Sequence, residues 1–385
     1  MGGGLSDQAP RAREFVVHAC LGQGGFGEVY RATMRSLSGL DRVVAVKLLR
    51  VDIDAEGDAV RRLRDEGRLL AALDHPAILR VMDVIGLDGR VALVAEFVDG
   101  FDLADCFRDQ PLGHRALLQV TGAVAEALQA AFHTVGPGGP YRVVHRDLKP
   151  ANVRLGRHGE VKLLDFGVAR FEGPDREART ATGTLVGTLP YMAPERFSRA
   201  VVEPPSDIFS LGATLYEGLV GRRFYAGASV RDIGALSMDE RGFAAYRDRR
   251  GEGLAQTPEP LRRLVLDMLS FEARHRPSAA EVVERCDELA EVAGGPNLRS
   301  YCRNRPSRPP IHIEGSLVGR TLCEGRLGLS DPEPAGNDGL MEVAPPARSR
   351  RRAIALAAGF GCMGLVVLGA VLTGLVAILV GWMAI

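Results

Sequence analysis

The sequence predicts an α+β protein with two lobes of unequal character, a strand-rich first lobe and a helical second lobe, followed by one transmembrane helix. Helical periodicity dominates from residue 111 onward, as in residues 117–128, which predicts the second lobe. The 33 residues from 353 to 385 carry no charge, which predicts the transmembrane helix. The first lobe is predicted from β-type apolar runs at residues 15–30, which surround a glycine cluster, and at 43–49, 78–85 and 91–98.

Composition indicates a globular protein with a substantial core. The chain has 385 residues, of which 46% are hydrophobic and 25% charged. Its formal net charge is zero, so nucleic acid is not expected as a partner. The six cysteines are scattered without a Cys-x-x-Cys pair, which argues against a zinc site or a disulfide scaffold. The N-terminus lacks the apolar core of a signal peptide, so no cleavable signal is expected.

Domain boundaries follow from shifts in composition. After a short N-terminal segment, residues 1–13, we expect one folded unit over residues 14–293. Residues 294–352 carry Gly, Pro, Arg and Ser with little periodicity, which predicts a flexible juxtamembrane linker.

The transmembrane prediction for residues 353–385 also gives an orientation. A spanning helix needs about 20 apolar residues, and this run is longer. Four arginines stand within residues 348–352, directly before it, and Trp382 lies near its far end. Because positive residues stay on the cytoplasmic side, we expect a single-pass anchor in the cell (inner) membrane with the folded unit in the cytoplasm. A homodimer through this helix is an open alternative, because glycines at 361, 364, 369 and 374 let two helices pack closely.

The glycine cluster is the first candidate for binding a nucleotide. Residues 21–29 read Leu-Gly-Gln-Gly-Gly-Phe-Gly-Glu-Val, and glycine lets the backbone approach phosphate oxygens closely. A G-x-G-x-x-G run alone is weak, since dinucleotide-binding domains carry one as well. In those domains a helix follows the glycines, but residues 28–32 favour a continuing strand. No Gly-Lys-Ser/Thr element follows either, so a P-loop is disfavoured.

Lysine is rare in this chain, and two of its positions are suggestive. Of 48 basic residues only three are lysines: Lys47 ends an apolar run, Lys149 lies within residues 145–152, and Lys162 has no obvious catalytic duty. A lysine ammonium is a compact point charge that suits a phosphate in a tight site, whereas arginine presents a planar fork. Glu66, on a charge-rich segment expected to be helical at 59–73, is a candidate partner for Lys47.

The strongest chemical signal is a pair of motifs after residue 140. The run His-Arg-Asp-Leu-Lys-Pro-Ala-Asn at 145–152 offers Asp147 to accept a hydroxyl proton, the cation Lys149 and the amide oxygen of Asn152. Thirteen residues later Asp165 opens the run Asp-Phe-Gly and offers a second metal-binding oxygen ligand. Phosphoryl transfer needs this set of magnesium ligands, phosphate cations and a residue that orients the nucleophile. The run Tyr-Met-Ala-Pro-Glu then follows at 191–195.

This ordered series resembles the bacterial eukaryotic-like (Hanks-type) Ser/Thr protein kinases, over about three quarters of the chain. The resemblance implies the two-lobed kinase fold, ATP and Mg²⁺ as cofactors, and transfer of the γ-phosphate to Ser or Thr of cytoplasmic proteins. A lysine two residues after the catalytic aspartate looks like the Ser/Thr branch. Two other classes are alternatives. A membrane-anchored pseudokinase scaffold commonly lacks one of the catalytic residues, all of which are present here, and a small-molecule kinase is disfavoured by residues 191–195.

The resemblance also implies roles for individual residues. Asp147, Lys149 and Lys47 would be catalytic, and Asn152 and Asp165 would hold the metal. Ala95 looks like the gatekeeper, with backbone groups of Glu96 and Val98 binding adenine and Asp102 binding ribose. The nucleotide site as a whole would comprise Leu21, Gly22, Gln23, Gly24, Gly25, Phe26, Gly27, Val29, Ala45, Lys47, Glu66, Glu96, Val98, Asp102, Asn152 and Asp165.

Supporting and regulatory residues are implied in the same way. Asp207 resembles the aspartate that braces the catalytic loop, and Glu195 is expected to pair with Arg276. Arg146, directly before the catalytic aspartate, is expected to bind a phosphate on the activation loop. Autophosphorylation is therefore expected at one or more of Thr180, Thr182 and Thr184, whereas Thr188 resembles the threonine that helps to bind substrate.

Overall fold

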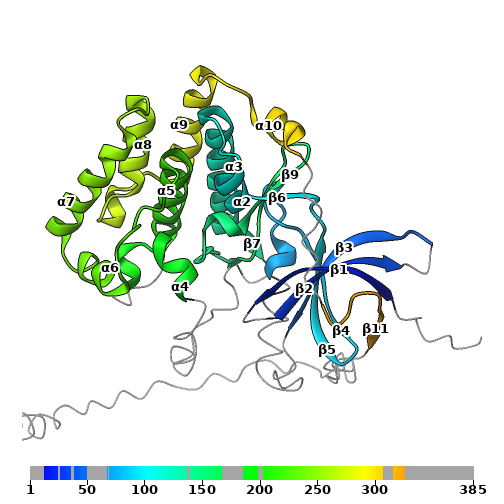
Figure 1. Cartoon of the computed structure of the whole chain (residues 1–385). Coiled ribbons are helices and arrows are strands. Elements are labelled where there is room, and N and C mark those ends of the chain that lie inside the picture. The colour runs from blue at the N-terminus through cyan, green and yellow to red at the C-terminus, as the bar shows by residue number, and fades with distance from the viewer. Residues whose placement is uncertain are drawn as a thin grey trace, which may run out of the picture. The chain divides into compact units, whose positions relative to one another are not determined.

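The computed structural model describes nine stretches of the chain: residues 13–24, 27–35, 39–49, 67, 69–136, 139–166, 185–197, 203–306 and 315–325 (Figure 1). Met1–Ser330 forms one compact unit, and the second unit, Asp331–Ile385, lies outside the described residues. The predicted transmembrane segment and Thr180, Thr182 and Thr184 also lie outside them. Among the helices that are described, none is both long and apolar enough to cross a bilayer.

The first lobe is rich in strands, as predicted, and its strands pair as an antiparallel sheet. Its consecutive strands are β1 (Glu14–Gly24), β2 (Gly27–Arg35), β3 (Arg42–Leu49), β4 (Val81–Leu87) and β5 (Arg90–Glu96). Alternate residues of β3 are buried, so Val44, Val46 and Leu48 face a core shared with Phe15 and Tyr30. Because side chains alternate along a strand, the residues between them face the other side of the sheet.

One further strand closes this sheet into a barrel. β11 (Thr321–Gly325) pairs antiparallel with both β1 and β4, giving the order β1-β11-β4-β5-β3-β2. The helix α10 (Leu298–Asn304) also lies in the stretch predicted to be a flexible linker, and it packs on the second lobe. The linker prediction for 294–352 is therefore wrong for these two elements. Composition does not reveal short segments whose order comes from packing against distant parts of the chain.

The second lobe is helical, as predicted. The long helix α3 (His114–His133) packs against α5 (Pro204–Val220) and α9 (Ala279–Val292), with its apolar face buried. α9 begins with a capping box, in which the side chains and backbone of Ser278 and Glu281 bond reciprocally. The other helices are α2 (Leu103–Asp109), the short α4 (Leu185–Thr188), α6 (Val230–Leu236), α7 (Glu240–Gly251) and α8 (Glu259–Met268).

A small sheet lies against α2 and α3 and carries the loops of interest. It consists of β6 (Gly100–Asp102), β9 (Val153–Gly156) and β10 (Val161–Leu163) in the order β10-β9-β6. The 3-10 turn η1 (Pro150–Asn152) leads into β9, and Asp165 follows β10 by two residues. The Gly/Pro-rich stretch between α3 and His145 forms a two-stranded hairpin of β7 (Val135–Gly136) and β8 (Gly139–Pro140).

Candidate functional site

The glycine-rich sequence forms the turn between β1 and β2. Gly24 pairs with Gly27 at its end, and Gly22 pairs with Val29 further in. At Gly27 a side chain is excluded, because φ is +147° and a Cβ atom would lie 2.0 Å from the carbonyl oxygen of Leu48. The prediction that a strand and not a helix follows the glycines is confirmed. Gly25 and Phe26 lie outside the described residues.

The predicted nucleotide residues of β2 and β3 share the face of the sheet opposite the core. Val29 lies directly across from Lys47, and Ala45 lies across from the gatekeeper position Ala95. Ala95 is 2% exposed, which places its small side chain at the back of this face. The face therefore combines apolar side chains with the cation of Lys47, as a base and its phosphates would require.

Lys47 connects the two lobes. Its Nζ atom lies 2.7 Å from Oδ1 of Asp165, and the side chains are 28% and 57% exposed. The predicted partner Glu66 lies outside the described residues, so the Lys47–Glu66 pair stays a prediction. The lysine ammonium and the metal-binding candidate Asp165 are thus brought together from positions 118 residues apart.

Lys149, Asn152 and Thr188 surround the predicted catalytic residue Asp147. Asp147 Oδ1 accepts a hydrogen bond from the hydroxyl of Thr188 at 2.6 Å, and Oδ2 accepts from Lys149 Nζ at 2.8 Å. Lys149 Nζ also lies 3.4 Å from the Thr188 hydroxyl. The Asn152 amide nitrogen donates to the Asp147 carbonyl oxygen at 2.7 Å. Residues from the loop at 145–152 and from the end of α4 therefore form one network.

The loop that carries Asp147 is held by a buried aspartate. Asp207, at the start of α5, accepts hydrogen bonds from the backbone N–H groups of His145 at 2.6 Å and Arg146 at 2.9 Å. Arg146 has a φ of +66°, a conformation that costs energy for a residue with a side chain and needs support. Burial raises the pKa of Asp207, although the charge and backbone hydrogen bonds around His145 oppose this. The predicted brace is confirmed.

The residues proposed for the metal fit an ion such as Mg²⁺. Hard cations prefer carboxylate and amide oxygens, which Asp165 and Asn152 supply. The Asn152 nitrogen is used by Asp147, so its amide oxygen points away from that residue. The Leu164 N–H donates to the Asn152 carbonyl oxygen at 2.8 Å, which holds the residue before Asp165 against Asn152.

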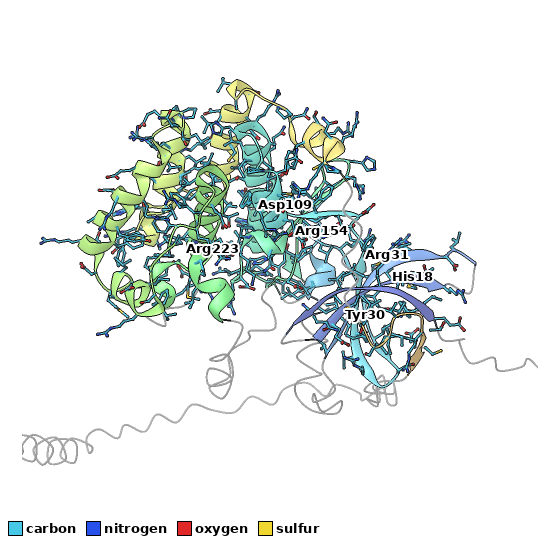
Figure 2. All side chains as sticks on the ribbon, viewed as in Figure 1. His18, Tyr30, Arg31, Asp109, Arg154 and Arg223 are labelled. Atoms are coloured by element: carbon cyan, nitrogen blue, oxygen red, sulfur yellow. The ribbon has the colours of Figure 1, made fainter. Side chains whose placement is uncertain are left out.

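The predicted adenine and ribose residues are engaged by an arginine that the sequence analysis missed. Arg154 lies on β9 and is labelled in Figure 2. It donates to the carbonyl oxygen of Val98 at 2.7 Å, to that of Gly100 at 3.1 Å and to Asp102 Oδ1 at 2.7 Å. Burial raises the pKa of the Asp102 carboxyl, and the charge of Arg154 opposes this. The ribose-binding candidate is therefore paired within the protein. The sequence signal for this contact was the charged Arg154 within the otherwise apolar strand β9.

Lys162, which had no expected duty, braces the strand that ends at the segment predicted to bind adenine. Its Nζ atom lies 2.6 Å from Glu96 Oε1, and its side chain is 15% exposed. The same Glu96 oxygen accepts from the Arg80 N–H at 2.9 Å. Glu96 thus uses its side chain for structure, which leaves its backbone as the part expected to meet adenine.

The predicted pair Glu195–Arg276 is confirmed. Nη1 and Nη2 of Arg276 lie 2.7 and 2.8 Å from the two carboxylate oxygens of Glu195, and the Arg276 side chain is 0% exposed. Burial would raise the pKa of Glu195, but the hydrogen bonds and charge of Arg276 outweigh it, so the net shift is downward. This pair lies outside the Asp147 network and is structural.

Three known protein kinases are similar to this chain in sequence. The chain is 36% identical over 338 residues to the serine/threonine-protein kinase pkn2 of Myxococcus xanthus, an alignment that covers 86% of this chain and 39% of that protein. It is 31% identical over 347 residues to the serine/threonine-protein kinase PkaA of Streptomyces coelicolor, covering 87% and 58% respectively. The tyrosine-protein kinase MasK of Myxococcus xanthus is 31% identical over 277 residues, covering 69% and 41%.

The chain spans between 39% and 58% of the length of these three relatives. A family match described as the protein kinase domain covers residues 15–286, which is more than half of the chain. The glycine-rich turn and the Asp147 network fall within that match, as do both lobes except for β11 and the helical residues after 286. The chain belongs to the protein kinase family.

Proposed function

We propose that this protein is a Ser/Thr protein kinase that transfers the γ-phosphate of ATP to hydroxyl groups of cytoplasmic proteins and of its own activation loop. The observation that carries the proposal is the contact of the Thr188 hydroxyl with Asp147 and Lys149. A substrate hydroxyl in that position would donate its hydrogen bond to the Asp147 carboxylate, which orients the oxygen for attack and accepts the proton. The two curated relatives named as Ser/Thr kinases support the same class.

Each charged residue has a distinct task in this mechanism. Lys149 stands beside Asp147 and stabilises negative charge on the phosphoryl group as it moves. Lys47 holds the nucleotide phosphates from the sheet side. When bound between Asn152 and Asp165, Mg²⁺ supplies positive charge that neutralises the phosphate oxygens. A pseudokinase scaffold is the alternative. It is disfavoured because all four residues are present and lie in contact as two pairs, Lys47 with Asp165 and Asn152 with Asp147.

Loss of the Asp147 carboxylate tests the proposal. In Asp147→Asn the amide cannot accept the hydroxyl proton, so the initial rate of autophosphorylation with Mg²⁺ and labelled ATP should fall by at least about a hundredfold. Binding of a non-hydrolysable ATP analogue should stay within about threefold, because Asp147 is assigned to the hydroxyl and not to the nucleotide. Acid hydrolysis of the labelled protein should yield phosphoserine or phosphothreonine.

Two results would contradict the proposal in different ways. Wild-type protein that binds the analogue but incorporates no label would favour the scaffold. Label recovered only as phosphotyrosine would keep the kinase and replace the Ser/Thr class, in line with the name of the relative MasK.

We also propose that residues 353–385 anchor the protein in the cell membrane as a single helix, with the kinase domain in the cytoplasm. The uncharged run and the arginines directly before it support this. Removal of residues 353–385 should move the protein from the alkaline-carbonate-resistant membrane pellet to the supernatant, while autophosphorylation is kept. Recovery of the shortened chain in the pellet would contradict the anchor. Helix contact through the glycines at 361, 364, 369 and 374 stays a prediction.

A further inference from the structure

Residues 315–325, here called the closing segment, lie beyond the part of the chain that matches the protein kinase family, which ends at residue 286. The segment forms a turn over residues 316–319 and then β11. β11 fills the space between β1 and β4 and so turns an open sheet into a barrel (Figure 1). A sheet edge that is covered in this way no longer exposes unpaired backbone groups.

The closing segment holds the first half of β1 through the backbone. Phe15 of β1 pairs with Leu322, and the Val17 N–H donates to the carbonyl oxygen of Arg320 at 2.9 Å. The Gly319 N–H donates in return to the Val17 carbonyl oxygen at 3.0 Å. Leu322 is 2% exposed and belongs to the core cluster of the first lobe. The segment is therefore part of the lobe's core and not only a cover on its surface.

Three charged side chains tie the closing segment to both neighbouring strands. Arg13, directly before β1, contacts Glu324 of β11 at 2.8 Å and Asp83 of β4 at 2.6 Å. Hydrogen bonds from Arg13 hold the pKa of the Glu324 carboxyl below its ordinary value. These side chains are about a third exposed, so we expect the ion pairs to fix the register of the strands more than to stabilise the fold.

The other end of the segment reaches the base of the glycine-rich turn. Gly315 lies so close to Cys20 and Tyr30 that a Cβ atom added to it would be 2.8 Å from the Cys20 Cβ and 2.8 Å from the Tyr30 ring. Cys20 and Tyr30 face each other across β1 and β2. The register of that pairing shifts between Cys20 and Gly22, the first glycine of the turn. The contact is therefore made one step before the predicted phosphate-binding backbone.

The chain that leads to the closing segment is fixed on the second lobe. Tyr301 of α10 donates its hydroxyl hydrogen bond to the Gln110 carbonyl oxygen, and Arg305 contacts Asp109 at 3.3 Å. Residues 307–314 join this anchor to Gly315 on the first lobe. The lobes are thus linked covalently twice, once between β5 and β6 and once here.

We propose that residues 315–325 are a positioning segment of the kinase domain: they hold β1, and with it the glycine-rich turn, in the arrangement that binds nucleotide. The functional catalytic unit then extends to residue 325. The proposal rests on the proposed function for the nature of the ligand. What it adds to that function is the coupling between Gly315 and the glycine-rich turn.

Two glycines of the same segment give a matched test. Gly315 and Gly325 both lack a positive φ, but a Cβ atom at Gly325 would meet nothing within 4 Å. In the full-length protein, Gly315→Ala should displace Cys20 and Tyr30 and weaken binding of a Mg²⁺-bound non-hydrolysable ATP analogue by at least about fivefold, measured by calorimetry. Gly325→Ala should stay within about twofold of wild type.

A second measurement separates positioning from support of the fold. Amide hydrogen exchange of the peptide covering residues 14–24 should rise at least about tenfold in Gly315→Ala and not in Gly325→Ala. A lower melting temperature with unchanged analogue affinity and unchanged exchange in that peptide would overturn the proposal. If the wild type bound no nucleotide, the proposed function would fail, and the exchange result alone would decide whether the segment holds the turn.

Discussion

Replacing Lys47 by arginine is expected to lower the rate of phosphoryl transfer by at least about a hundredfold, although the charge is kept. The Lys47 ammonium lies 2.7 Å from Asp165 in a space bounded by the cross-strand residues Val29 and Leu93. A guanidinium is wider, planar and set on a different stem, so it cannot occupy one point between a carboxylate and the phosphates. Initial rates of autophosphorylation at saturating ATP measure the loss.

Lys162 provides the control for this substitution. It too contacts a single carboxylate, at 2.6 Å, but that carboxylate is the side chain of Glu96, which is not expected to meet the phosphates. An arginine at 162 can keep a contact with Glu96, so Lys162→Arg should change the rate by less than about threefold. Equal losses for the two variants would contradict a special role for Lys47 and would point to a general intolerance of arginine at buried lysines.

The parts of the site that could be predicted are those where function fixes residue type and spacing locally. Asp147, Lys149 and Asn152 lie within six consecutive residues, and one turn of backbone brings them together. The long-range pair Glu195–Arg276 could be predicted only through resemblance to a family, because nothing in the local sequence couples positions 81 residues apart. The sheet and helices followed from periodicity, which reflects which face is buried.

The parts that could not be predicted depend on tertiary partners. β11 has only five residues, and Leu322 becomes a core residue because two sheet edges lie on either side of it. In a stretch rich in Gly, Pro and Arg, that environment leaves no periodic signal. Arg154 is a similar case: its three acceptors lie on the segment 98–102, which only the pairing of β6 with β9 brings into reach. Both β11 and the Arg154 contacts thus depend on strand pairing between segments that are far apart in the sequence.

Removing Arg276 is expected to be the most destabilising single change outside the site. All five guanidinium hydrogens are used: Nη1 and Nη2 each bond Glu195 and one carbonyl oxygen, and Nε bonds the carbonyl oxygen of Ser270. In Arg276→Met, Glu195 would keep the Ser206 hydroxyl at 2.6 Å but lose the Arg276 guanidinium. Breaking a buried ion pair by removing one partner costs about 3–5 kcal/mol of the free energy of unfolding, measured by urea denaturation.

The matched control is an exposed pair of the same residue types. Arg262 contacts Glu259 on α8 with side chains 42% and 65% exposed, so Arg262→Met should cost less than about 1 kcal/mol. The double variant Arg276→Met with Glu195→Gln should recover part of the loss, because the Glu195 charge is removed together with that of Arg276. Similar losses at Arg276 and Arg262 would contradict the assignment.

The dependence on pH gives the same pair a second signature. The pKa of Glu195 is lowered in the folded protein from an ordinary value of 4.5, so its ionised form stabilises the fold fully only above about that pH. As pH falls, the unfolded state takes up the proton first, and the contribution is lost by the time pH passes the lowered folded value. The difference in unfolding free energy between wild type and Glu195→Gln should therefore be largest at pH 7 and shrink toward pH 3. A difference that stayed constant over this range would mean that Arg276 stabilises the lobe through its carbonyl contacts and its position 5.0 Å over the Phe209 ring, and not through the Glu195 charge.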